Sequence, residues 1–68
     1  MFCVVRGQKG NKRYFENSFD AENYAYELSE KYSVANVYLQ KQIYGSWLTI
    51  AKYRDGLQVN GVLWDMFK

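Results

Sequence analysis

The sequence predicts a single α+β domain: an antiparallel sheet of four to five strands, in the order β-β-α-β-β, with one helix packed on one face. Three observations support this prediction. Short β-favouring runs occur in both halves of the chain, a stretch between them has apolar residues at helical spacing, and glycine-containing turns separate the runs. At 68 residues the chain suits one domain, residues 1–68, and its 19% aromatic content supplies the large side chains that so small a core requires.

The first two strands are expected to form a hairpin. Residues 2–6 and 12–16 are short β-favouring runs. Residues 7–11 between them form a polar loop with two glycines, which adopt positive φ without steric cost.

A helix is expected to follow this hairpin. Asp20 has the short acceptor side chain of an N-cap, and Phe19 and Tyr24 are spaced to pack together around the first turn. The helix is then predicted to run from residue 21 to residue 31 or 32. Its inner face is expected to contain Ala21, Tyr24, Ala25, Leu28 and Tyr32.

A second hairpin is expected after the helix. Residues 34–44 alternate between apolar and polar side chains, Gly45-Ser46 interrupts the alternation, and residues 47–53 resume it. The apolar face would pack on the helix. The outer face would present the aromatic side chains of Tyr38, Tyr44, Trp47 and Tyr53.

The C-terminal segment is open to two interpretations. Asp55-Gly56 is a tight-turn dipeptide, so residues 57–59 can add a short strand. Residues 62–67 fit either a final strand or a short helical turn, because periodicity over six residues does not separate the two.

The residue inventory excludes several functions. The chain has no histidine, which removes Ser-His-Asp and Cys-His catalytic arrangements, and one cysteine without histidine does not form a structural zinc site. Calcium-loop and phosphate-loop spacings are also absent. We therefore expect no catalytic residue, no metal and no cofactor. Because Cys3 has no partner for an intrachain disulfide and no run of residues is long and apolar enough for a membrane span, we expect a cytoplasmic protein that does not enter a membrane.

The aromatic content favours a protein-binding surface. Seven tyrosines and two tryptophans exceed what a core of this size can enclose, and these residues are enriched in interface hot spots. The candidate binding residues are Tyr38, Tyr44, Trp47 and Tyr53 on the outer sheet face and Trp64 in the tail. Two alternatives stay open: the tail packs over the outer face and buries both, or two copies of the chain pair through that face as a homodimer.

A basic N-terminal hairpin favours a second kind of partner, nucleic acid. Four positive side chains with no acidic residue among them are suited to contacting phosphates. They are Arg6, Lys9, Lys12 and Arg13. The alternative interpretation is a solvated edge that resists pairing with other sheets. The helix itself is acidic, so it is not expected to enter a duplex groove.

Residues 12–28, KRYFENSFDAENYAYEL, resemble a hairpin-to-helix pattern common in small bacteriophage proteins and in the arm-type DNA-binding domains of phage integrases. As a compact, aromatic-faced domain without catalytic residues, the chain is also similar in kind to phage inhibitors of host defence, including anti-CRISPR proteins. This resemblance implies a non-enzymatic inhibitor or adaptor that occludes a larger protein or nucleoprotein complex through its aromatic sheet face. The alternative function is a nucleic-acid-binding module that uses the basic hairpin.

Overall fold

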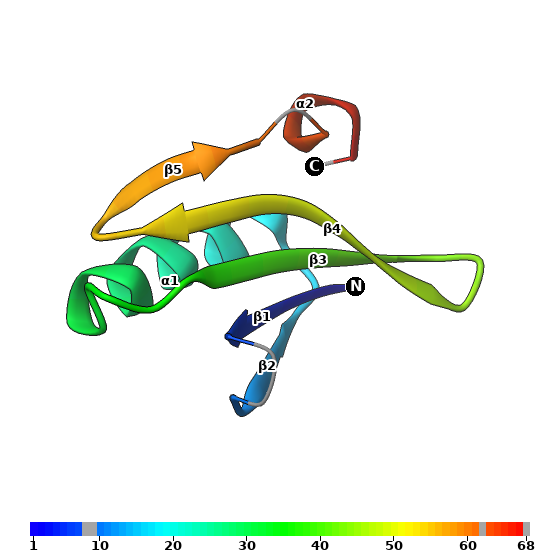
Figure 1. The fold of residues 1–68 in the computed structure, drawn as a ribbon. Helices are drawn as coiled ribbons and strands as arrows, with labels where there is room; N and C mark the ends of the chain where they lie inside the picture. The colour runs from blue at the N-terminus through cyan, green and yellow to red at the C-terminus, as the bar shows by residue number, and fades with distance from the viewer. Residues whose placement is uncertain (8–9, 62, 68) are drawn as a thin grey trace.

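The computed structural model describes residues 1–7, 10–61 and 63–67 and confirms an α+β fold. Its five strands form one antiparallel sheet in the order β2-β1-β3-β4-β5 (Figure 1). The elements along the chain are β1 (Phe2–Arg6), β2 (Lys12–Phe15), α1 (Ser18–Lys31), β3 (Val37–Ile43), β4 (Ser46–Arg54), β5 (Leu57–Asn60) and α2 (Trp64–Phe67). The short strand after Asp55-Gly56 is therefore present, and the tail forms a helical turn.

Helix α1 connects an edge of the sheet to its centre. The chain leaves β2 at one edge, crosses through α1 and enters β3, which pairs with β1. The other connections are hairpins between neighbouring strands. This crossover places the acidic helix over one face of the sheet. The strands on either side of the helix in the sequence, β1 and β2 before it and β3, β4 and β5 after it, belong to that one sheet.

The helix begins earlier than the sequence predicts. The side chain of Asn17 caps it, because its Oδ1 accepts hydrogen bonds from the backbone N–H of Phe19 at 2.7 Å and of Asp20 at 3.3 Å. The prediction of Asp20 as the cap was wrong: Asn17 offers the same kind of acceptor three residues earlier, on an extended backbone. Asp20 instead lies in the first turn, where its negative charge interacts favourably with the helix dipole.

Two-residue turns close both C-terminal hairpins. Tyr44 and Gly45 have φ of 50° and 81°, and Asp55 and Gly56 have φ of 52° and 74°. Positive φ at both central residues is typical of type I′ turns, whose twist matches that of the flanking strands. The first turn therefore lies one residue before the predicted Gly45-Ser46 break, and Tyr44 belongs to the tip of the hairpin and not to the strand face.

A β-bulge in β4 changes the face on which Tyr53 lies. Between the pairs that β3 makes with Thr49 and Ala51, Ile50 is an extra residue on β4. An extra residue shifts the alternation by one position. Ile50 and Ala51 are both buried in the core, and the following Tyr53 points to the helix side, where it is fully buried. The prediction of Tyr53 on the outer face was wrong for this reason.

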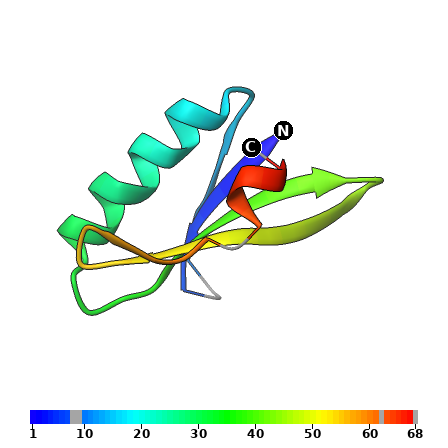
Figure 2. The same ribbon diagram turned by 90° about the horizontal axis from the view of Figure 1, so that it is seen from above.

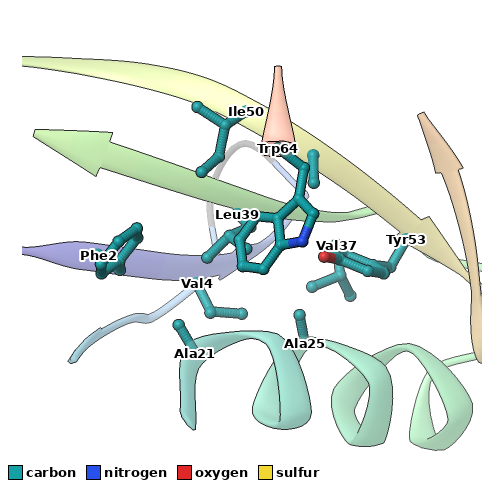
Figure 3. Close-up of a cluster of buried hydrophobic side chains, with 10 residues drawn as sticks. Phe2, Val4, Ala21, Ala25, Val37, Leu39, Ile50, Tyr53 and Trp64 are labelled. Carbon is teal, nitrogen blue, oxygen red and sulfur yellow. The ribbon is translucent and has the colours of Figure 1, made fainter. Parts of the chain in front are cut away.

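The core lies between the sheet and the two helices. Figure 2 shows α1 and α2 on the same side of β3 and β4. Trp64 of α2 packs in the same buried cluster as Ala21 and Ala25 of α1 and Tyr53 of β4 (Figure 3). The described part of the tail, residues 63–67, therefore does not cover the opposite face of the sheet, contrary to one alternative left open by the sequence. The indole of Trp64 belongs to the core.

Candidate binding surface on the open face of the sheet

The sheet face opposite α1 has no second layer among the residues that the structure describes. Strand register and side-chain alternation determine which residues this face contains. We call this surface the open face. Its residues are Cys3 and Val5 from β1, Lys12 and Tyr14 from β2, Tyr38, Gln40 and Gln42 from β3, Trp47, Thr49, Lys52 and Arg54 from β4, and Leu57 from β5.

The open face has a buried floor. Cys3 is 0% exposed and Val5 is 3% exposed, although no described helix covers them. Two rings of the same face meet above the sheet: those of Tyr14 on β2 and Trp47 on β4 approach to 5.7 Å between centroids. Since β1 and β3 lie between these two strands, the rings reach toward each other across the centre of the sheet. The bulge in β4 contributes to this shape, because a bulge bends its strand and increases the local twist of the sheet.

The floor is neutral as well as buried. Burial raises the pKa of the Cys3 thiol, and the nearby Lys12 ammonium offsets this rise only in part. Thiols react as thiolates, so Cys3 acts here as a small apolar side chain and not as a nucleophile.

A hollow of about 340 Å³ lies beside this floor. This volume is at the lower end of the range for clefts that bind small ligands. Gln40 Nε2 donates a hydrogen bond to Thr49 Oγ1 at 3.2 Å. This bond uses neither the Gln40 carbonyl oxygen nor the Thr49 hydroxyl proton, so an acceptor and a donor remain here for a ligand. The hollow is lined by Val5, Gly7, Lys12, Tyr38, Gln40 and Thr49.

Charge is segregated between the sheet and the rest of the molecule. None of the five strands contains an acidic residue, whereas six of the nine lysines and arginines lie in strands. On the open face the positive side chains are Lys12, Lys52 and, at the end of β4, Arg54. The seven acidic residues all lie in helices or connecting segments: Glu16, Asp20, Glu22, Glu27, Glu30, Asp55 and Asp65. The open face therefore presents positive charge without a carboxylate to neutralise it.

The structure brings together two of the five aromatic residues predicted for protein binding. Tyr38 and Trp47 lie on the open face, while Tyr44 is fully exposed at the hairpin tip and Tyr53 and Trp64 are in the core.

Tyr14 belongs to the open face and was missed by the sequence analysis. The signal was present, because Tyr14 lies two residues after Lys12 in a short strand and alternation places both on one face.

The predicted basic hairpin is divided between the two faces of the sheet. Lys12 lies on the open face, but the guanidinium of Arg13 lies 4.9 Å from the ring centre of Tyr24, on the helix side. Lys9 lies outside the described residues. Adjacent residues of a strand point in opposite directions, so Lys12 and Arg13 do not share one patch.

Arg6 also lies on the helix side of the sheet. Its guanidinium carbon is 3.9 Å from the ring centre of Tyr32, which follows α1. Such close stacking of a guanidinium on an aromatic ring is a favourable cation–π contact. It holds Arg6 at the end of the helix, on the side opposite the hollow.

The described residues contain no group of three or more His, Cys, Asp or Glu side chains placed to hold a metal ion. In the same part of the chain, no helix has both the length and the apolar character needed to cross a lipid bilayer. Comparison of the chain with protein-family models, with curated proteins and with solved structures found no match. The resemblance to phage proteins therefore stays a prediction.

Proposed function

We propose that this protein is a non-enzymatic binding protein that engages a larger partner through the open face. The observation that carries this proposal is a sheet face that no described helix covers, with three aromatic rings and two lysines around a buried floor. Exposed surfaces of this composition, with aromatic residues among polar ones, are typical of interaction sites. Tyr14, Tyr38 and Trp47 are the aromatic contacts in this proposal, and Lys12 and Lys52 are the charged ones.

The protein would act by occlusion. A domain of 68 residues that covers a partner's surface needs no catalytic group, and this is the mode of action implied by its similarity in kind to phage inhibitors of host defence. We propose a cytoplasmic location, since a single reduced cysteine under the open face suits a reducing compartment.

Two partner classes are compatible with this surface. A protein partner is supported by Tyr38 and Trp47, because tyrosine and tryptophan anchor many protein interfaces. A nucleic-acid partner is supported by Lys12 and Lys52 and by the absence of carboxylates from the strands. In the second case the contact surface is the open face and not the N-terminal hairpin as a whole.

Affinity capture with matched variants tests the proposal. Tagged wild-type protein is incubated with a bacterial lysate, with and without nuclease, and captured material is compared with that from Tyr38→Ala and Trp47→Ala. If either side chain is a central contact, its loss should weaken binding by about 2 kcal/mol or more while the fold, checked by circular dichroism, is retained.

Tyr44→Ala is the matched control. It removes the same kind of side chain from the fully exposed hairpin tip, away from the open face, and should capture the same material as the wild type. Equal capture by all four proteins would contradict the proposal, because the partner would then bind elsewhere.

A further inference from the structure

We infer that the partner of the open face is single-stranded nucleic acid, with one nucleotide seated in the hollow beside Tyr38. This inference rests on the proposed function, since it names the partner of the same surface. Three properties of the open face carry it: its charge, its aromatic rings and its remaining hydrogen-bonding groups.

The first property is charge complementarity with phosphate. Lys12 lines the hollow, and Lys52 pairs across the sheet with Tyr38, which lines it too. Two ammonium groups therefore flank the hollow on a face without carboxylates. A polyanionic strand gains counterion release at each lysine that it neutralises and meets no like charge on this face.

The second property is the arrangement of aromatic rings. Tyr38 lines the hollow, and Tyr14 and Trp47 form a ring pair on the same face, 5.7 Å apart between centroids. Unpaired bases stack on rings of this kind without regard to sequence. The Val5 floor, 3% exposed, provides an apolar base for the hollow.

The third property is hydrogen-bonding capacity at the hollow. The bond from Gln40 Nε2 to Thr49 Oγ1 holds both side chains, and it leaves the Gln40 carbonyl oxygen and the Thr49 hydroxyl proton for a ligand. A carbonyl acceptor beside a hydroxyl donor complements the polar edge of a base. That edge is accessible only when the base is unpaired.

Other occupants fit this surface less well. A duplex would need an element that enters a groove, and the long helix on the other side of the sheet is acidic, so it would meet the phosphates with like charge. A second copy of the chain packed through this face would bring together two positively charged surfaces with no carboxylate on the strands of either to pair with the lysines. Charge thus disfavours a homodimer through the open face.

Fluorescence anisotropy with labelled oligonucleotides tests the inference. The probes are single-stranded DNA and RNA of one mixed sequence, about 12 nucleotides long, and the DNA duplex of that sequence. Titrations are made at several salt concentrations between about 50 mM and about 200 mM. We expect binding to single strands that exceeds binding to the duplex and weakens as salt increases; comparison of DNA with RNA identifies the preferred sugar.

Variants on the two faces provide the decisive comparison. Lys12→Gln and Lys52→Gln should each reduce the slope of log affinity against log salt by about 0.7, the value for one phosphate contact with a single strand. Arg13→Gln removes the same charge from the neighbouring position on the opposite face and should leave the slope unchanged.

Replacement of the ring in the hollow tests stacking. Tyr38→Ala should lower the affinity roughly 5- to 150-fold, which corresponds to the loss of one stacked base. Tyr38→Phe keeps the ring and should retain most of the affinity, whereas Tyr44→Ala at the hairpin tip should have no effect.

Three outcomes would overturn the inference: no binding of single strands at about 50 mM salt, stronger binding of the duplex, or equal effects of Lys12→Gln and Arg13→Gln. If oligonucleotides fail to bind but a nuclease-resistant protein is captured in a manner that depends on Tyr38 and Trp47, the nucleic-acid inference is wrong and the proposed function stands. If neither partner depends on the open face, both are wrong.

Discussion

Tyr53 is a large polar side chain enclosed in an apolar environment. Its ring meets that of Tyr26 edge-on, with centroids 4.7 Å apart, and its hydroxyl has no hydrogen-bond partner among the described residues. Burial raises the pKa of Tyr53, and the negative charge of Glu22 and of an ionised Tyr26 raises it further. The ring therefore stabilises the core by its apolar area, while the hydroxyl is a cost.

Tyr53→Phe is expected to increase the free energy of unfolding at neutral pH by about 1 kcal/mol, because it removes a buried unpaired hydroxyl and keeps the ring. Urea denaturation followed by circular dichroism measures this change. Tyr44→Phe at the exposed hairpin tip is the control and should have no effect. A loss of stability in Tyr53→Phe would show that the hydroxyl has a favourable partner.

The wild type and Tyr53→Phe should also differ in how their stability depends on alkaline pH. Because the pKa of Tyr53 in the folded state exceeds the ordinary tyrosine value of 10.0, the unfolded state loses the proton first. The contribution of Tyr53 to stability is fully present below pH 10.0 and declines above it, by about 1.4 kcal/mol per pH unit. Denaturation at rising pH should show this decline in the wild type and a smaller decline in Tyr53→Phe; parallel curves would contradict it.

Helix α1 contacts the sheet through small side chains. Ala21, Ala25 and Ser29 are its buried residues, spaced four apart, which lets the helix backbone approach the sheet closely. The Ser29 hydroxyl donates to the Tyr26 carbonyl at 2.9 Å and accepts from the Gly56 N–H at 3.0 Å. These two bonds satisfy a buried polar group and connect the helix to the turn between β4 and β5.

Asn17→Ala is expected to lower the free energy of unfolding by about 1 kcal/mol, because it removes the acceptor that caps the first amides of α1. Asn23→Ala is the matched control: the same substitution at an exposed position of the same helix should be neutral or slightly stabilising, since alanine favours helix. Chemical denaturation of the two variants measures the difference. Equal effects would mean that the cap of Asn17 contributes nothing.

At the scale of the whole molecule, the sheet separates two surfaces of different character. The helix side holds the core and the acidic α1, and the open face holds positive charge, aromatic rings and a hollow. Each surface contains one of the two tryptophans: Trp64 is 7% exposed in the core, and Trp47 is partly exposed on the open face. Trp64 therefore stabilises the core, whereas Trp47 is available for binding on the open face.

Trp64→Ala is expected to lower the free energy of unfolding by about 3–5 kcal/mol, the cost of a large cavity in a core. A domain of this size has a total stability of roughly 3–10 kcal/mol, so the variant should be largely or wholly unfolded. Trp47→Ala should cost about 1 kcal/mol, because its ring is only partly buried. Thermal and urea denaturation of both variants measure the contrast; similar losses would contradict the division between core and open face.

The sequence predicted those features that depend on neighbouring residues. The helix stripe around Ala21 and Ala25, the turn at Asp55-Gly56 and the alternation that places Tyr38 outward are all local, because helical and strand periodicity are properties of a short stretch of backbone. The acidic character of the helix and the absence of histidine also follow directly from the amino-acid sequence. These local patterns were sufficient to identify Tyr38, Trp47 and Lys12 as residues of the candidate site. Strand alternation also predicts that Tyr14 lies on the same face as Lys12.

Only the tertiary structure decided the positions of Tyr53 and Trp64 and the burial of Cys3. The bulge at Ile50 exists in relation to the partner strand β3, and one extra residue exchanges the faces of every position that follows in β4. Trp64 fills space that the sheet and α1 enclose together, and Cys3 is buried on a face where rings from β2 and β4, far apart in the chain, meet. Local periodicity contains no information on such contacts between distant segments, and these contacts determine which aromatic residues remain on the open face for a partner.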